Sequence, residues 1–95
     1  MAAYLIADLD VTDPSVFEEY RQQVAPLVAK YGGKYVVRGG TVETVEGDWS
    51  PKRLVILEFE NMERLKAWYE GDDYRPVMAM RHQSAHSNVV IVEGA

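Results

Sequence analysis

The chain is predicted to fold as a single α+β domain over residues 1–95, in the order strand, helix, strand, strand, helix, strand. Three observations carry this prediction. Short runs of aliphatic and β-branched residues, which are typical of strands, alternate with segments in which apolar residues recur every three or four positions, as on one face of a helix. The content of 47% hydrophobic and 26% charged residues indicates a chain that folds around a core. The length of 95 residues fits one domain.

The first strand and the first helix have clear local signals. Residues 3–9 form a short apolar stretch and are expected to be a strand. Apolar side chains between Val16 and Tyr31 then follow one helical face. Asp13 is expected to cap this helix, because its side chain can accept a hydrogen bond from a free backbone N–H of the first turn. Pro26 predicts a kink or a break, since proline cannot donate the helical hydrogen bond.

The middle of the chain admits two arrangements. Two β-rich stretches, residues 35–38 and 41–45, are separated by Gly39 and Gly40. They predict either a hairpin or one long strand bent at a glycine bulge, and we favour the bent strand. A loop is expected over residues 47–51, which combine glycine, aspartate, serine and proline.

The second half of the chain supplies the remaining strands and helices. Residues 53–59 are the strongest predicted strand, and Asn61 is expected to cap a helix that ends at Gly71. A shorter helix is expected over residues 74–81, and a last strand over residues 88–93. The order βαββαβ is that of the ferredoxin-like fold, in which helices cover one face of a four-stranded antiparallel sheet.

The predicted sheet is apolar on both faces. A strand with one solvated face alternates apolar and polar residues, but residues 53–59 are mostly apolar on both sides, as are residues 3–9 and 89–92. Burying the roughly six large groups left on the second face contributes on the order of 10 kcal/mol before entropic costs. We therefore predict a homodimer through the helix-free sheet face. The alternative is that the helix of residues 74–81 or the loop around Trp49 covers this face.

Charge and composition exclude several partners and chemistries. A formal net charge of -5, without a run of basic residues, disfavours nucleic acid and anionic membranes as partners. No apolar stretch approaches the roughly 20 residues of a membrane span, and residues 1–10 make a poor signal peptide, so a cytoplasmic location is expected. The chain has no cysteine, which excludes disulfides and thiolate chemistry.

Charged residues within apolar elements mark the candidate site. They are Arg38, Arg53, Arg81, Glu58 and Asp8. Such residues are rarely buried without partners. In a cavity between the sheet and its helices, the arginines are expected to bind a carboxylate or enolate of a small ligand, with Glu58 or Asp8 as general base. The alternative is a structural ion pair, for example between Arg53 or Arg38 and Glu58.

Aromatic and histidine residues complete the candidate set. Four aromatic residues are predicted to form the pocket wall, or else to be ordinary core or dimer contacts. They are Trp68, Tyr69, Tyr20 and Tyr74. His82 is a candidate general acid or base. His82 and His86 have the spacing of two metal ligands on a helix, but no third ligand is obvious, so we predict no metal site and no cofactor.

Several short motifs occur in a fixed order along nearly the whole chain. They include Tyr-Gly-Gly at 31–33, Val-Arg-Gly-Gly at 37–40, Glu-Gly-Asp-Trp at 46–49, Trp-Tyr at 68–69 and Val-Glu-Gly at 92–94. This set resembles the family of unknown function numbered 1330 (DUF1330). The resemblance implies a dimeric α/β barrel, in which two sheets face each other. The wider superfamily includes cofactorless antibiotic-biosynthesis monooxygenases, muconolactone isomerase-like proteins and haem-degrading enzymes, but the family itself implies no reaction.

Two functions follow as hypotheses from these observations. One is a cofactorless enzyme that performs proton transfer or oxygenation on a small polar or aromatic molecule. The other is a non-catalytic dimer that binds a small ligand or acts as an interaction module. A closed cavity with a polar centre and an unpaired buried carboxylate would favour the enzyme.

Overall fold

The computed structural model describes residues 1–95 and confirms the predicted order of elements, with a third helix between α2 and the last strand. The elements are β1 (Ala3–Val11), α1 (Pro14–Lys30), β2 (Lys34–Arg38), β3 (Arg53–Phe59), α2 (Met62–Tyr69), α3 (Arg75–Ser84) and β4 (Ala85–Glu93). None of the three helices combines the length and hydrophobicity that a membrane-spanning helix needs.

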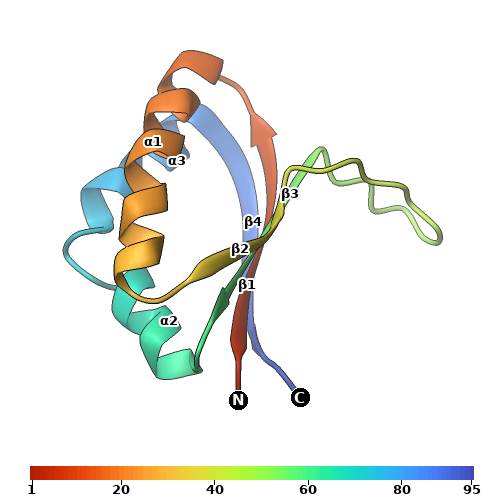
Figure 1. The fold of residues 1–95 in the computed structure, drawn as a ribbon. Helices are drawn as coiled ribbons and strands as arrows, with labels where there is room; N and C mark the ends of the chain where they lie inside the picture. The colour runs from red at the N-terminus through yellow and green to blue at the C-terminus, as the bar shows by residue number, and fades with distance from the viewer.

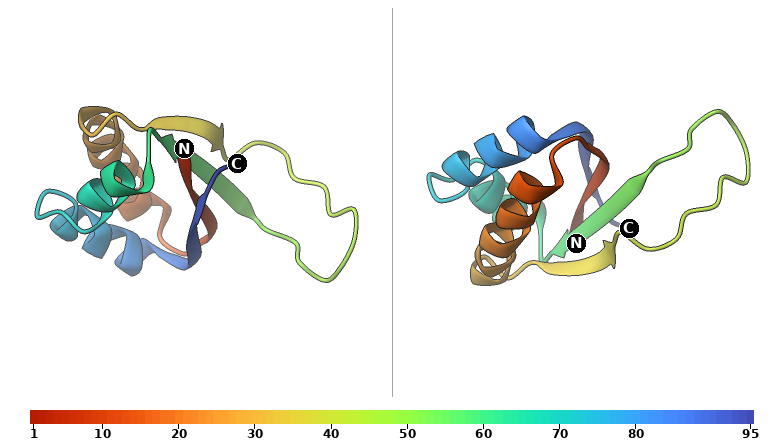
Figure 2. Two further views of the ribbon diagram at one scale, coloured as in Figure 1. Left: turned by 90° about the horizontal axis from the view of Figure 1, so that it is seen from below. Right: turned by 90° about the horizontal axis from the view of Figure 1, so that it is seen from above.

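The four strands form one antiparallel sheet in the order β2-β3-β1-β4, and all three helices lie on the same face of it (Figures 1 and 2). This is the ferredoxin-like arrangement. In the central strand β1, the buried Leu5, Ala7 and Leu9 alternate with the partly exposed Ile6 and Asp8. The first set points toward the helices, and the second set belongs to the helix-free face.

Helix α1 begins as predicted. The Asp13 carboxylate accepts a hydrogen bond from the Val16 backbone N–H at 3.3 Å. The helix is continuous through Pro26, which lies on its exposed side, so of the predicted kink or break the break is wrong. The helix ends at Lys30, and Gly32 then turns the chain with a φ of 81°, in the left-handed region that favours glycine.

Gly33 brings the chain close to the core. A Cβ at this position would lie 2.6 Å from the Phe59 ring and 2.8 Å from Val28 Cγ1, and both side chains are fully buried. Gly33→Ala is therefore expected to lower the free energy of unfolding by about 1–3 kcal/mol, the usual cost of overpacking a core. Urea denaturation measures this loss. Gly40→Ala is the matched control, because its Cβ would meet nothing within 4 Å. Equal losses in the two variants would contradict the packing described here.

Residues 39–52 contain no strand, so the predicted bent strand is wrong. β2 ends at Arg38, and Gly39 turns the chain with a φ of 68°. The following segment, called the β2–β3 loop below, extends away from the sheet on the side opposite the helices (Figures 1 and 2). Residues 41–45 have a β-like composition, but no other strand of the chain lies beside them, and a strand forms only where a partner completes its hydrogen bonds.

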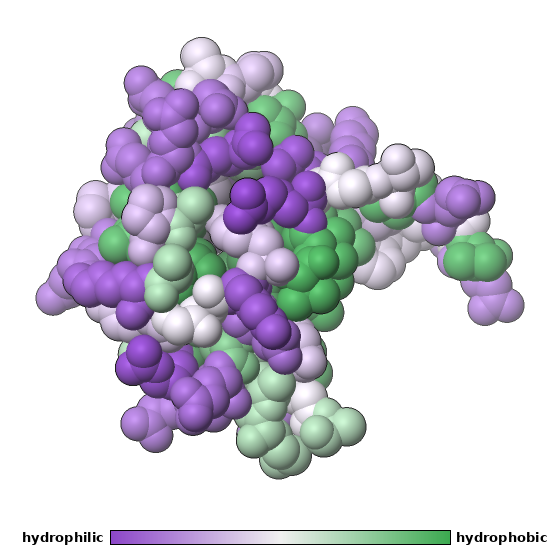
Figure 3. Space-filling model, in the orientation of Figure 1, coloured by the Kyte–Doolittle hydropathy of each residue, from purple (hydrophilic) through white to green (hydrophobic).

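The helix-free face stays largely uncovered. α3 packs beside α1 on the other face of the sheet, so it does not provide the cover considered as an alternative to a dimer. The β2–β3 loop touches this face through Trp49 Nε1, which donates a hydrogen bond to the Asp8 carboxylate at 2.7 Å. Val36, Val90 and Val92 nevertheless stay exposed. Figure 3 shows apolar side chains gathered beside the base of this loop, away from the polar surface of the helices.

Candidate functional site

A cavity of about 160 Å³ lies between the sheet and the helices. Its wall is mostly apolar, since 14 of the 20 residues that line it are hydrophobic. A dry apolar cavity of about 150 Å³ holds a benzene molecule. The cavity is therefore large enough for one compact small molecule.

All residues predicted to bind a ligand or to form the pocket wall line this cavity. Tyr20 comes from α1, Trp68 and Tyr69 from α2, and Tyr74 directly precedes α3, while the arginines come from three different elements. These residues are Tyr20, Arg38, Arg53, Trp68, Tyr69, Tyr74 and Arg81. The hypothesis of a ligand site between sheet and helices requires that these side chains lie around one cavity, as they do.

The three candidate bases, Glu58, Asp8 and His82, lie outside the cavity. Glu58 is directly opposite Tyr4 on the helix-free face, where it accepts a hydrogen bond from the Tyr4 hydroxyl and pairs with Lys34, both at 3.3 Å. The expectation that Glu58 lies between sheet and helices is therefore wrong. Asp8 lies on the same helix-free face and accepts the hydrogen bond from Trp49. The ion pair expected between Arg38 or Arg53 and Glu58 is absent.

His82 is exposed on α3 and lies with His86 in an open groove next to the cavity. The groove and the cavity share three lining residues, Tyr69, Arg81 and Val89. No group of three or more histidine, aspartate or glutamate side chains is arranged to hold a metal ion. The histidine pair therefore has no third ligand within the chain.

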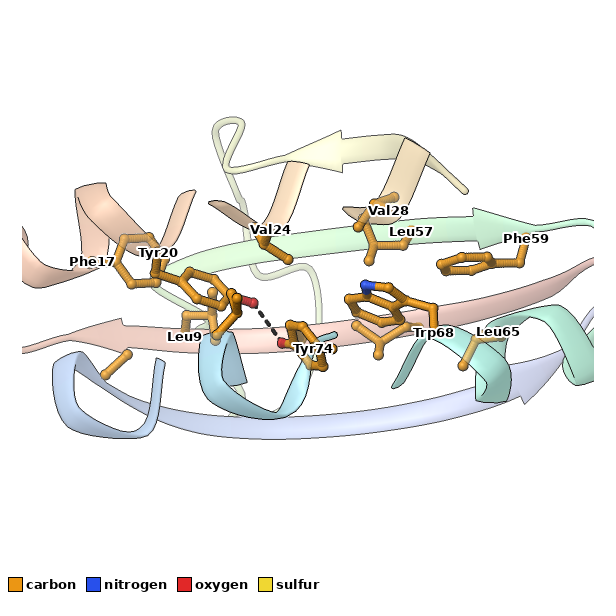
Figure 4. Close-up of a cluster of buried hydrophobic side chains, with 14 of the residues drawn as sticks. Leu9, Phe17, Tyr20, Val24, Val28, Leu57, Phe59, Leu65, Trp68 and Tyr74 are labelled. Atoms are coloured by element: carbon orange, nitrogen blue, oxygen red, sulfur yellow. Dashed lines mark hydrogen bonds between the residues drawn. The ribbon is translucent and has the colours of Figure 1, made fainter. Parts of the chain in front are cut away.

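Two tyrosines and a tryptophan of the wall pack closely together (Figure 4). The hydroxyls of Tyr20 and Tyr74 are 2.8 Å apart and hydrogen-bonded to each other. Burial raises the pKa of both phenols above the ordinary range, so they are neutral at physiological pH and act as hydrogen-bond groups rather than bases. Trp68 packs on Tyr74, with ring centroids 4.4 Å apart. Its Nε1–H is buried and has no partner in the protein.

Arg81 is a buried cation without a carboxylate partner. Its side chain is 4% exposed, its Nη2 donates to the Tyr69 hydroxyl over a long 3.4 Å, and its Nε has no partner. Burial disfavours the charged form, but Tyr74, Tyr20 and Tyr69 outweigh burial and raise the pKa of Arg81. The guanidinium therefore carries its positive charge at any physiological pH.

Arg53 and Arg38 add two more guanidiniums to the wall. Arg53 lies against the backbone at Gly39 and 5.6 Å from the centre of the Phe17 ring, and its Nε is buried without a partner. Burial and the like charges of Arg21 and Arg38 lower the pKa of Arg53, although arginine still stays charged. Arg38 stacks 3.7 Å above the Tyr35 ring.

Several cavity residues have no counterpart in the sequence prediction. Arg21 and Glu18 line the cavity and are bound to each other at 2.8 Å on the surface of α1. Phe17 and Tyr35 stack against the arginines. The helical spacing offered a signal for Arg21, which is itself exposed but follows the buried Phe17 by four residues and the buried Tyr20 by one.

Together these features define a ferredoxin-like α+β protein with a small, apolar, arginine-lined cavity between sheet and helices. The chain belongs to the family described as a domain of unknown function (DUF1330), which matches residues 2–95. No curated protein matches this chain.

Solved structures share the fold at low sequence identity. A protein of unknown function from Rhodopseudomonas palustris has a TM-score of 0.81 and 14% identity, covering 99% of this chain and 82% of that chain. A dimeric ferredoxin-like protein of unknown function from Jannaschia sp. CCS1 has a TM-score of 0.73 and 14% identity, covering 99% and 100%. A cofactor-independent oxygenase from Streptomyces nogalater has a TM-score of 0.65 and 11% identity, covering 99% and 93%. These similarities confirm the predicted fold.

Proposed function

We propose that this protein binds a small organic anion with an apolar, ring-sized body in the cavity between sheet and helices. The proposal rests on the buried polar atoms that have no hydrogen-bond partner within the protein. In the cavity wall these atoms are Arg53 Nε, Arg81 Nε and Trp68 Nε1, and all three are donors. A buried donor without a partner costs about 1–3 kcal/mol. A ligand that supplies acceptors removes this cost.

The charge of the cavity also favours an anion. Arg38, Arg53 and Arg81 have no carboxylate within ion-pair distance, whereas Arg21 is already paired with Glu18. This concentration of positive charge occurs in a chain whose formal net charge is -5. Arginine binds carboxylates through two parallel hydrogen bonds, which gives both affinity and orientation. The apolar remainder of the wall suits the body of the ligand.

The protein acts in this proposal as a homodimer through its helix-free sheet face. The apolar residues exposed on that face support this assembly, because an apolar patch of this kind marks an interface. Proteins of the same fold from Jannaschia sp. CCS1 and Thermobifida fusca are described as dimeric. The cavity lies on the opposite face of the sheet, so ligand and partner would occupy different surfaces.

Cofactorless catalysis is the second candidate function. It is favoured by the cluster of cations, which would stabilise an enolate or phenolate formed on a bound substrate. The similar Streptomyces nogalater protein is a cofactor-independent oxygenase. The cavity wall contains no histidine, however, and its one carboxylate, Glu18, is paired with Arg21. Binding therefore has more support than proton transfer, because no side chain of the cavity is placed to act as a base.

The double variant Arg53→Met/Arg81→Met tests the proposal. Methionine keeps much of the side-chain volume but removes both charges, and replacing buried charges by apolar groups often leaves a fold intact. Thermal shift over a panel of small aliphatic and aromatic carboxylates is the measurement. The native protein is expected to be stabilised by at least one of them. The double variant should bind that ligand at least about 100-fold more weakly, since each charged hydrogen bond contributes about 1.5–3 kcal/mol.

Glu58→Gln is the matched control for this experiment. It removes a charge from the other face of the sheet and should leave the ligand-induced shift unchanged. If no carboxylate stabilises the native protein, or if the double variant responds as strongly as the native protein, the proposal is wrong.

A further inference from the structure

The cations of the cavity fall into two groups. Arg81 belongs to α3, which runs directly into β4, and its neighbours are Tyr74 just before α3, Tyr20 of α1 and Tyr69 of α2. Arg53 and Arg38 belong to β3 and β2, and their neighbours are Phe17 and Tyr35. The strands β3 and β4 lie on opposite sides of β1, which separates their backbones by about 10 Å. The two groups therefore approach the cavity from the two opposite edges of the sheet, on its helix-covered face.

Each group presents a buried donor without a partner. At one end this donor is Arg81 Nε, and at the other end it is Arg53 Nε. Neither arginine is part of an ion pair with any carboxylate of the chain. Arg81 has only its long hydrogen bond to Tyr69. Both ends thus present a guanidinium without an acidic partner, although Arg81 is buried and Arg53 is partly exposed.

Apart from the arginines, the cavity wall offers little to a charged group. Leu57, Val24 and the ring of Trp68 are apolar parts of this wall. The hydroxyls of Tyr20 and Tyr74 satisfy each other. This remainder of the wall suits an uncharged, compact body.

We propose that the ligand of this cavity is a small dianion, in which two acidic groups are separated by a compact apolar or aromatic body. One acidic group binds Arg81, and the other binds Arg53 and Arg38. This inference rests on the proposed function above and specifies its ligand class. The burial of Arg81 supports it, because this guanidinium is 4% exposed and an uncompensated buried charge is costly. A second acidic group would pair with the partly exposed Arg53 and the exposed Arg38, which also have no carboxylate partner.

Calorimetric titration of the full chain with three aromatic acids tests the inference. Terephthalate carries its two carboxylates at opposite ends of a ring, phthalate carries them side by side, and benzoate has one. Terephthalate is expected to bind at least tenfold more tightly than benzoate, which corresponds to about 1.4 kcal/mol. Phthalate has the same charge as terephthalate but reaches only one end, so it should bind like benzoate. Adipate against hexanoate repeats the comparison with a flexible body.

Single variants show which arginine binds each acidic group of the ligand. Arg81→Met and Arg53→Met should each reduce the affinity for terephthalate to that for benzoate, while benzoate still binds at the remaining end. Arg81→Lys, which retains the charge, replaces Arg81→Met if the latter does not fold. Equal binding of all these anions to the native protein, or a full preference for terephthalate in either variant, would overturn the inference and leave the proposed function standing. If no anion binds, both fail.

Discussion

Replacing Trp68 by alanine is expected to lower the free energy of unfolding by about 3–5 kcal/mol, the usual cost of deleting a large buried aromatic side chain. Trp68 is 2% exposed, and its ring lies 4.4 Å from that of Tyr74 and 5.5 Å from that of Phe59. It joins α2 to β3 and to the segment that leads into α3. Small proteins have only about 5–15 kcal/mol of stability in total, so this loss is a large fraction of it.

Urea denaturation followed by far-UV circular dichroism measures this loss. The protomer concentration must be the same for all variants, because dimerisation adds to the apparent stability. Trp49→Ala is the matched control, since Trp49 is the only other tryptophan and is 59% exposed in the β2–β3 loop. Its removal should cost far less, and Trp68→Phe should fall between the two. If Trp68→Ala and Trp49→Ala lose the same stability, Trp68 is not the centre of the core.

The parts of the fold that could be predicted are those with strong local signals. The caps Asp13 and Asn61 accept hydrogen bonds from the backbone three residues later, and the predicted strand of residues 53–59 is β3. The loop over residues 47–51 was predicted, but the full length of the β2–β3 loop was not, because residues 41–45 are rich in the β-branched threonine and valine that favour strands. Whether such a segment pairs depends on a partner strand elsewhere in the fold, which local sequence does not reveal.

The candidate site could be predicted in part. Charged residues within apolar elements correctly identified three arginines that line one cavity. Glu58 was misplaced for a physical reason. Alternation groups it with Leu54 and Ile56, opposite Leu57 and Phe59, but both groups are largely apolar, so the sequence does not say which of them faces the helices. The exposure of His82 could have been predicted from the sequence. Helical spacing places Arg81, four residues after the apolar Val77, on the buried side of α3 and leaves His82 outside it.

Val90→Asp is expected to dissociate the proposed homodimer. Val90 is 58% exposed on the helix-free face, beside the partly exposed Ile6 of β1. In a symmetric dimer each substitution occurs twice. Losing one buried valine from each protomer removes about 3 kcal/mol in total, and burying two carboxylates adds a further cost. The dissociation constant should therefore rise by at least about 100-fold.

Sedimentation at micromolar concentration distinguishes the two states, since the protomer mass is 10.8 kDa. Ala79→Asp is the control, because it adds the same charge to an exposed position of α3, on the far side of the sheet, and should leave the dimer intact. A native protein that sediments as a monomer, or a Val90→Asp variant that stays dimeric, would contradict the proposed interface. Because Val90 already tolerates solvent in the isolated chain, a monomeric variant should keep its secondary structure. Loss of the dimer without loss of the fold would thus show that the second apolar face serves assembly rather than the core of the protomer.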